Sequence, residues 1–322
     1  MLRSKRQTLF FSVTIFLSAG LLFAVQPMLG KMMLPLVGGS PSGWLTALAF
    51  FQLALLAGYL LAHGFSKFSA RGQAWGTVAV LLFGTLLLPP NFTVDEGANI
   101  GSVEQVLWLL FRAIFVPYLG LATVSSGLQR LYAARQGGAD PYFLYAASNA
   151  GSFVGLLAYP LIVEPLLPLS SQRILWTVGY GLLLVLIALL AAPKQAATTT
   201  ATATTTTSQT TPPPIDKISW RQRGLWVLLA FIPSSLSMGL TALVTADLGS
   251  FPLLWVIPLG LYLLTFVIAF AEKQIIAAGT LAKLQLITFV PLLIVFLGNG
   301  GAYAPYWAYT FIPLAAFFAG SL

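Results

Sequence analysis

The chain has 322 residues, of which 58% are hydrophobic and only 7% are charged. A soluble domain carries about 25% charged residues, so this composition excludes an ordinary soluble globular protein. The net charge of +8 does not indicate nucleic-acid binding, because the Lys and Arg residues are spread over alternate loops and form no basic motif. There is no cysteine and one histidine, His63, so thiol chemistry is excluded and we expect no bound metal and no cofactor.

Ten apolar segments follow one another along the chain, and each is predicted to be a transmembrane α-helix. Their approximate bounds are 8–29, 44–63, 75–89, 105–125, 142–163, 174–192, 224–245, 252–271, 281–298 and 305–321. They are apolar on all faces, and most are long enough to cross a hydrocarbon core of about 30 Å. In lipid every backbone N–H and C=O must be paired within the segment, which requires a helix. The predicted fold class is therefore an all-α polytopic membrane protein.

The distribution of Lys and Arg predicts a cytoplasmic N-terminus. In that orientation only Lys31 and Arg173 of the 16 basic residues fall in outside loops, and Arg112 falls within a span. Cytoplasmic loops of membrane proteins carry the excess of Lys and Arg. A secretory signal peptide is the alternative interpretation of Arg3–Arg6 and the apolar run after it, but no small-x-small cleavage site follows Val25.

A change of composition divides the chain after the sixth predicted span. Residues 196–214 read AATTTATATTTTSQTTPPP, which has too little apolar surface to fold. We interpret residues 196–220 as a cytoplasmic linker between a six-helix half, 1–195, and a four-helix second half, 221–322. Two sets of helices joined by a long connection are typical of major-facilitator proteins, which have two six-helix halves. The expected fold is therefore major-facilitator-like with an incomplete second half, and we expect the chain to be a fragment or truncated form.

Two stretches of the sequence resemble a known family. Residues Gln26–Trp44 read QPMLGKMMLPLVGGSPSGW, and residues Tyr145–Pro165 read YAASNAGSFVGLLAYPLIVEP. Both are similar to the membrane domain of bacterial fused major-facilitator/spermidine-synthase-like proteins. This resemblance implies a bacterial inner-membrane protein, and full members of that family add a soluble aminopropyltransferase-like domain. Because this sequence has no strand, glycine-rich loop and helix unit, we expect no aminopropyl transfer from the chain itself.

Arg112 is the first candidate functional residue. It lies about 12 Å into the fourth predicted span, where an arginine is costly and normally faces protein or water. One interpretation is a site for a substrate anion or a proton-linked switch. The other is a structural arginine that extends to the membrane interface or pairs with Glu104 or Glu164.

The fifth predicted span carries small and polar residues around Asn149. Ser148-x-x-x-Ser152 and Gly151-x-x-x-Gly155 have the spacing that allows two helices to approach closely, and an amide can hydrogen-bond across such a contact. Ser148, Gly151, Ser152 and Gly155 are therefore predicted helix-packing residues. Asn149 either holds two helices together or contacts a substrate.

Two glutamines complete the set of candidate residues. Gln26, at the predicted end of the first span, and Gln52, within the second, could line a central cavity, because polar groups avoid lipid. Each could equally hydrogen-bond to a neighbouring helix. No spacing of residues indicates a nucleophile with its base, paired carboxylates or a metal site, so the sequence does not predict an enzyme.

The leading functional hypothesis is a facilitator-like membrane protein that binds or transports a small polar solute. Arg112, Asn149, Gln52 and Gln26 would line its midplane cavity. A second hypothesis is a non-transporting anchor or regulatory module for a spermidine-synthase-like soluble domain or partner. A third is the permease subunit of an ATP-driven importer. The expected partners are the lipid bilayer, a small polar solute and, under the second hypothesis, the soluble domain; no nucleic acid is expected.

Overall fold

The computed structural model describes residues 2–37, 41–93, 102–136, 141–192, 219–248, 256–269, 277–297 and 306–321. Within these ranges the backbone is almost entirely helical and contains no strand. The predicted all-α fold class is therefore confirmed. Of the predicted linker, residues 196–220, only the last two residues lie within the described ranges.

The helices follow the order of the predicted spans. In chain order they are α1 (Leu2–Val37), α2 (Pro41–Phe65), α3 (Ala70–Gly84), α4 (Val103–Arg135), α5 (Tyr142–Ala158), α6 (Glu164–Leu166), α7 (Leu169–Ala191), α8 (Trp220–Leu248), α9 (Val256–Ala269), α10 (Ala278–Leu297) and α11 (Tyr306–Ser321). A 3-10 turn, Thr85–Leu87, follows α3, and a π-helical turn, Tyr159–Val163, separates α5 from α6. Every predicted span overlaps one of these helical segments.

Six of the described segments are long and apolar enough to cross a membrane: Arg6–Val37, Ser42–Phe65, Val103–Arg135, Phe143–Leu166, Leu169–Ala191 and Trp220–Ala242. The protein is therefore a multi-pass membrane protein. Helix α3 has only 15 residues, and the described apolar parts of α9 and α10, Val256–Thr265 and Gly279–Ile294, are also shorter than a full span. The total of ten spans stays a prediction.

The first helix is longer than predicted. It continues through Pro27 and Pro35 to Val37, so the predicted end near residue 29 is wrong. A proline removes one backbone donor, but neighbouring groups can satisfy the freed carbonyl in a membrane helix. The extension places Lys31 inside α1 rather than in a loop. There the Lys31 Nζ donates to the Glu164 Oε1 of α6 over 2.8 Å.

Prolines shape the end of the fifth span. Helix α5 is regular as far as Ala158, and Pro160 then lies within the π-helical turn. Because proline cannot donate a backbone hydrogen bond to the preceding turn, the helix widens there. Pro165 falls within α6 and Pro168 is the N-cap residue of α7, so the chain leaves this span at successive prolines.

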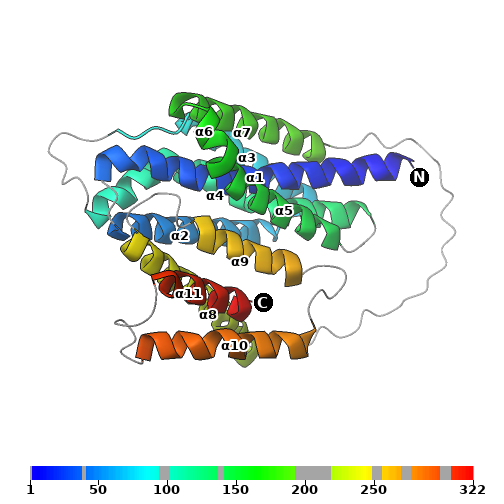
Figure 1. The fold of residues 1–322 in the computed structure, drawn as a ribbon. Helices are drawn as coiled ribbons and strands as arrows, with labels where there is room; N and C mark the ends of the chain where they lie inside the picture. Colours follow the sequence, from blue (N-terminus) through cyan, green and yellow to red (C-terminus); the bar gives the residue numbers. More distant parts are fainter. Residues whose placement is uncertain are drawn as a thin grey trace, which may run out of the picture.

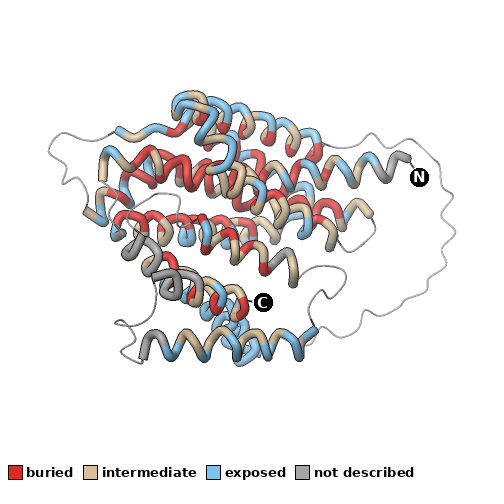
Figure 2. The backbone as a smooth tube through the Cα atoms, in the orientation of Figure 1, coloured by how far each residue is buried: buried red, intermediate tan, exposed pale blue. Residues whose placement is uncertain are grey.

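Helices α1–α5 and α7 share one continuous hydrophobic core, and the short α6 contributes no buried residue to it. Helix α1 contacts α4, α5 and α7 within this bundle (Figure 1), and buried residues recur along it (Figure 2). The Trp176 Nε1 donates to the Leu21 carbonyl over 2.9 Å, and the Tyr180 hydroxyl donates to the Leu81 carbonyl over 3.0 Å. These bonds join α7 to α1 and α3. Such bonds matter in a bilayer, because lipid removes most of the hydrophobic drive for helices to associate.

Helices α8–α11 form a second, looser group beside this bundle. Their small described core contains Leu240 of α8 and Phe317 of α11, which pack with residues of α9. Helix α9 also joins the group to the bundle, where Leu263 belongs to a cluster with Leu156 of α5 and Trp44 of α2. Figure 1 shows α9 next to the bundle and α10 at the far edge of the second group.

Candidate functional site

A cavity of about 370 Å³ lies between the α1–α7 bundle and α9. Its lining comes from five helices: Ser18, Ala19, Leu22 and Phe23 of α1; Leu55 and Tyr59 of α2; Leu121, Ala122 and Ser125 of α4; Ser148, Asn149 and Ser152 of α5; and Tyr262 and Leu263 of α9. We call it the polar cavity, because half of these side chains carry a hydroxyl or an amide. Its volume falls in the usual range of small-molecule sites, roughly 300–1,000 Å³.

Glycines place α5 directly on α1 beside this cavity. Gly151 lies against Phe16, and Gly155 lies against Gly20. A Cβ added to Gly155 would come within 2.7 Å of the Gly20 Cα, and one added to Gly151 within 2.9 Å of the Phe16 Cα. Such distances are too short for any side chain, so the approach of the two backbones requires glycine at these positions.

The amide of Asn149 is the most informative polar group in the cavity. The residue is half-buried, and neither its side chain nor the hydroxyls of Ser148 and Ser152 form a hydrogen bond to any residue that the structure describes. A carboxamide offers two donors and an oxygen that accepts two bonds. Burying such a group fully without a partner would cost roughly 2–7 kcal/mol, so the half-buried amide needs a polar partner in the cavity. Water or a polar solute in the cavity can supply the missing partners.

The other polar lining residues come from four different helices. The Ser18 hydroxyl donates to a backbone carbonyl of α4 over 3.5 Å, and the Ser125 hydroxyl accepts from the Gln129 Nε2 over 3.1 Å. Tyr59 of α2 and Tyr262 of α9 add one phenol from each group of helices. The polar cavity can therefore contact a solute from both groups at once.

Sequence analysis did not identify Ser18, Tyr59, Ser125 or Tyr262 as site residues. Each lies in an apolar segment, where a polar side chain is itself a signal of function. The signal is weak for these types, because serine is common at helix contacts and tyrosine at membrane interfaces. Only the tertiary contacts show which of them face the cavity.

Of the four predicted substrate-binding residues, the structure places only Asn149 at the polar cavity. Gln26 is buried in the core, where its Nε2 donates to the Tyr118 hydroxyl over 3.1 Å. Gln52 is exposed on α2 and is not among the lining residues that the structure describes. The structure therefore does not bring the four residues together.

Arg112 lies on the exposed side of α4. Its guanidinium carbon is 6.0 Å from the centroid of the Trp108 ring, one turn nearer to the start of the helix. Glu164, one of its two predicted partners, forms the ion pair with Lys31. An exposed arginine beside an aromatic ring is the arrangement expected of a side chain that extends toward the membrane interface.

Two other arginines join helices at one end of the bundle. The Arg130 Nη1 donates to the Gln73 Oε1 over 2.9 Å, and the Gln73 Nε2 donates to the Ala62 carbonyl over 3.2 Å. Arg135 donates to two carbonyl oxygens at the end of α7. Together these bonds connect α2, α3, α4 and α7 at the predicted cytoplasmic end.

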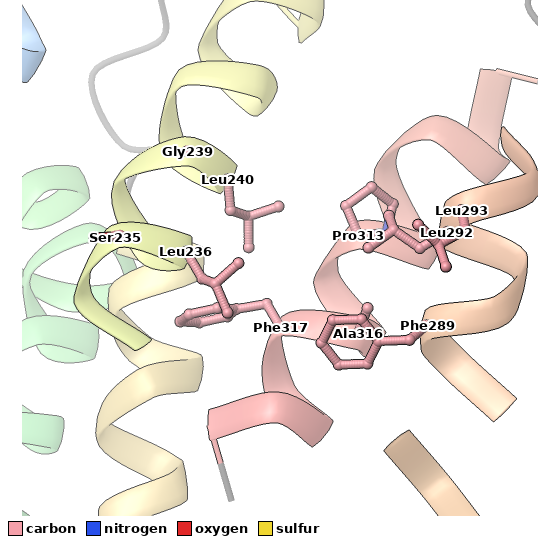
Figure 3. A pocket seen from close by; sticks show the side chains of 10 residues that line it. All are labelled: Ser235, Leu236, Gly239, Leu240, Phe289, Leu292, Leu293, Pro313, Ala316 and Phe317. Carbon is pink, nitrogen blue, oxygen red and sulfur yellow. The ribbon is translucent and has the colours of Figure 1, made fainter. Parts of the chain in front are cut away.

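A second cavity, of about 380 Å³, lies among α8, α10 and α11 (Figure 3). Leucine and phenylalanine side chains, among them Leu240, Phe289 and Phe317, form most of its lining. Ser235 carries the one hydroxyl among its described lining residues. A cavity this apolar lacks the placed polar groups that orient a small solute. We therefore locate the candidate site at the polar cavity.

The sequence matches no protein-family model and no curated protein. The class of protein thus rests on the structure itself. It is a helical, multi-pass membrane protein with a polar cavity between two groups of helices.

Proposed function

We propose that the protein binds a small polar solute in the polar cavity and carries it across the membrane. The observation that supports this most is the polar set on α5, where Asn149, Ser148 and Ser152 line the cavity without hydrogen-bond partners among the described residues. An amide whose role was to hold two helices together would be bonded across their contact. A solute that enters the cavity gives these groups the bonds that the protein does not.

The position of the cavity is suited to transport. Most of its lining belongs to the α1–α7 bundle, whereas Tyr262 and Leu263 belong to α9 of the second group. Alternating access requires two groups of helices that move around a site between them. We propose a major-facilitator-like arrangement with ten spans, in a bacterial inner membrane and with a cytoplasmic N-terminus. The sequence resemblance and the Lys and Arg distribution support these details.

Solute uptake by proteoliposomes tests the proposal. We expect the purified protein to take up at least one member of a panel of radiolabelled polyols, amides, amino acids, organic anions and polyamines. Asn149→Leu keeps the side-chain size but removes the amide, and should lower uptake roughly tenfold, the effect of one lost hydrogen bond. Gln52→Leu is the matched control, because Gln52 is exposed and does not line the cavity.

Equal uptake by the wild type and Asn149→Leu would contradict the location of the site. No uptake of any solute, from well-folded protein, would contradict transport and favour the membrane-anchor hypothesis.

The orientation has a separate test. The chain has no cysteine, so a single introduced cysteine reports on one position. With a cytoplasmic N-terminus, Lys67→Cys, between α2 and α3, should react with an impermeant maleimide only after permeabilisation. Thr93→Cys, on the exposed segment after α3, should react in intact spheroplasts. The reverse pattern would overturn the proposed orientation.

A further inference from the structure

We infer that the solute of the polar cavity is uncharged, with hydroxyl or amide groups along one side and an apolar face on the other. This inference rests on the proposed function and narrows its substrate class.

The lining of the polar cavity carries no charge among the residues that the structure describes. On the helices that line the cavity, Lys31 of α1 pairs with Glu164, Arg130 of α4 bonds to Gln73, and Arg135 of α4 bonds to backbone carbonyls. Arg112 of α4 lies on the exposed side of that helix. A charged solute would leave water for a site without an opposite charge, which is strongly unfavourable in low-dielectric surroundings. The cavity therefore discriminates against ions of either sign.

The polar and apolar lining residues indicate which chemical groups the solute carries and on which side. Ser148, Asn149 and Ser152 present two hydroxyls and a carboxamide from one helix. Apolar side chains from α1, α2, α4 and α9, including Phe23 and Leu263, account for most of the rest. A neutral molecule with polar groups on one edge satisfies the α5 groups while its apolar part packs on these side chains. Polyamines and organic anions do not fit this site.

Cysteine labelling measures this selectivity without knowledge of the solute. Because the 322-residue chain has no cysteine, Ser152→Cys in this chain places one thiol in the cavity. Three methanethiosulfonates of similar size serve as probes: the neutral 2-hydroxyethyl, the cationic 2-(trimethylammonio)ethyl and the anionic 2-sulfonatoethyl reagents. For each reagent, the rate of modification of Ser152→Cys is divided by the rate of modification of Lys67→Cys by the same reagent. Residue 67 is exposed between α2 and α3, so this division removes differences in intrinsic reactivity between the reagents.

After this normalisation we expect both charged reagents to modify Ser152→Cys about 100-fold more slowly than the neutral reagent, the scale of the penalty for a charge within a membrane protein. Equal rates for the neutral and either charged reagent would overturn the inference. So would a thiol that none of the reagents modifies, because a solute site must be accessible. Failure of uptake in proteoliposomes, in contrast, would overturn the proposed function whatever the reagent preference.

A second cysteine position keeps the test valid if Ser152→Cys fails to fold. Ser148→Cys lies one turn away on α5, lines the same cavity and is less buried than Ser152. The same ratio of rates is expected there, and rates for the charged reagents that match the neutral one at Ser148→Cys would equally reject an uncharged solute.

Discussion

Gly155 and Gly20 bring the backbones of α5 and α1 together, because neither residue carries a Cβ. The same segment of α5 carries Asn149 and Ser152, which line the polar cavity. The packing residues and the candidate binding residues thus share one segment of helix. A change at one glycine should disturb both the stability of the bundle and the shape of the cavity.

Gly155→Ala is expected to destabilise the protein. The new Cβ would lie 2.7 Å from the Gly20 Cα, so α1 and α5 must separate, and overpacking of this kind costs about 1–3 kcal/mol. Gly181→Ala on α7 is the matched control. A Cβ added at Gly181 would have nothing within 4 Å, and the change from glycine to alanine raises helix propensity equally at both positions. Thermal unfolding in detergent should give a lower Tm for Gly155→Ala alone. Equal Tm values for the two variants would show that the contact tolerates a methyl group.

At the scale of the element, α3 shows how a short helix is held in the bundle. Ser69 caps its start by accepting a hydrogen bond from the Gly72 N–H over 3.1 Å. Gln73, which is 3% exposed, then bridges Arg130 of α4 and the Ala62 carbonyl of α2. Polar bonds at this end therefore supplement the apolar contacts of a helix of only 15 residues.

Gln73→Leu removes both bonds while it keeps the side-chain volume. Because Arg130 is itself exposed, we expect a modest loss, about 1 kcal/mol of unfolding free energy. The exposed Gln52→Leu is the control for the same chemical change outside the core. Chemical denaturation in detergent micelles compares the two variants. A Gln73→Leu protein as stable as the control would mean that apolar packing alone holds α3.

At the scale of the whole molecule, the two groups of helices are unequal. The core of α1–α7 is continuous, and every residue in it belongs to the chain before residue 192. In α8, by contrast, residues 220–232 are exposed throughout. An apolar helix with all faces exposed depends on lipid or detergent for its cover. The first group should therefore fold without the second, whereas the reverse is not expected.

A comparison of two fragments tests this asymmetry. Residues 1–192 expressed alone should insert, keep helical circular dichroism and unfold cooperatively in detergent, because they contain the whole of the larger core. Residues 219–322 should show no cooperative transition, since their described core is limited to small clusters. A cooperative transition in the second fragment and none in the first would contradict the division.

The helices were largely predictable because hydropathy marks the part of a helix that meets lipid. It does not mark the parts that extend beyond, so α1 passes its predicted end and α4 continues to Arg135, past the expected end near residue 125. Lys31 is an example: it lies beyond the predicted apolar span, 8–29, but within the helix α1. Polar residues at the end of a span can remain helical, and only their contacts decide whether they do.

The candidate site was less predictable for a related reason. In segments that are apolar on every face, a sequence shows which residues are polar but not where they point. Gln26 and Asn149 are both amides in apolar segments. In the structure Gln26 bonds to Tyr118 in the core, whereas Asn149 lines the polar cavity. Arg112 and Gln52 were predicted to line the cavity, but in the structure both are exposed.

The sequence by itself determined that this is an all-α membrane protein, because long uncharged segments in lipid must satisfy their own backbone hydrogen bonds as helices. It also indicated that a neighbouring helix can approach α5 closely at Gly151 and Gly155, which lack a side chain, whereas the structure showed that this helix is α1. Only the tertiary structure decided that Asn149, Ser148 and Ser152 meet Tyr59 and Tyr262 around one cavity. The physical reason is that a cavity forms between helices, so its lining depends on how they pack and not on any single segment.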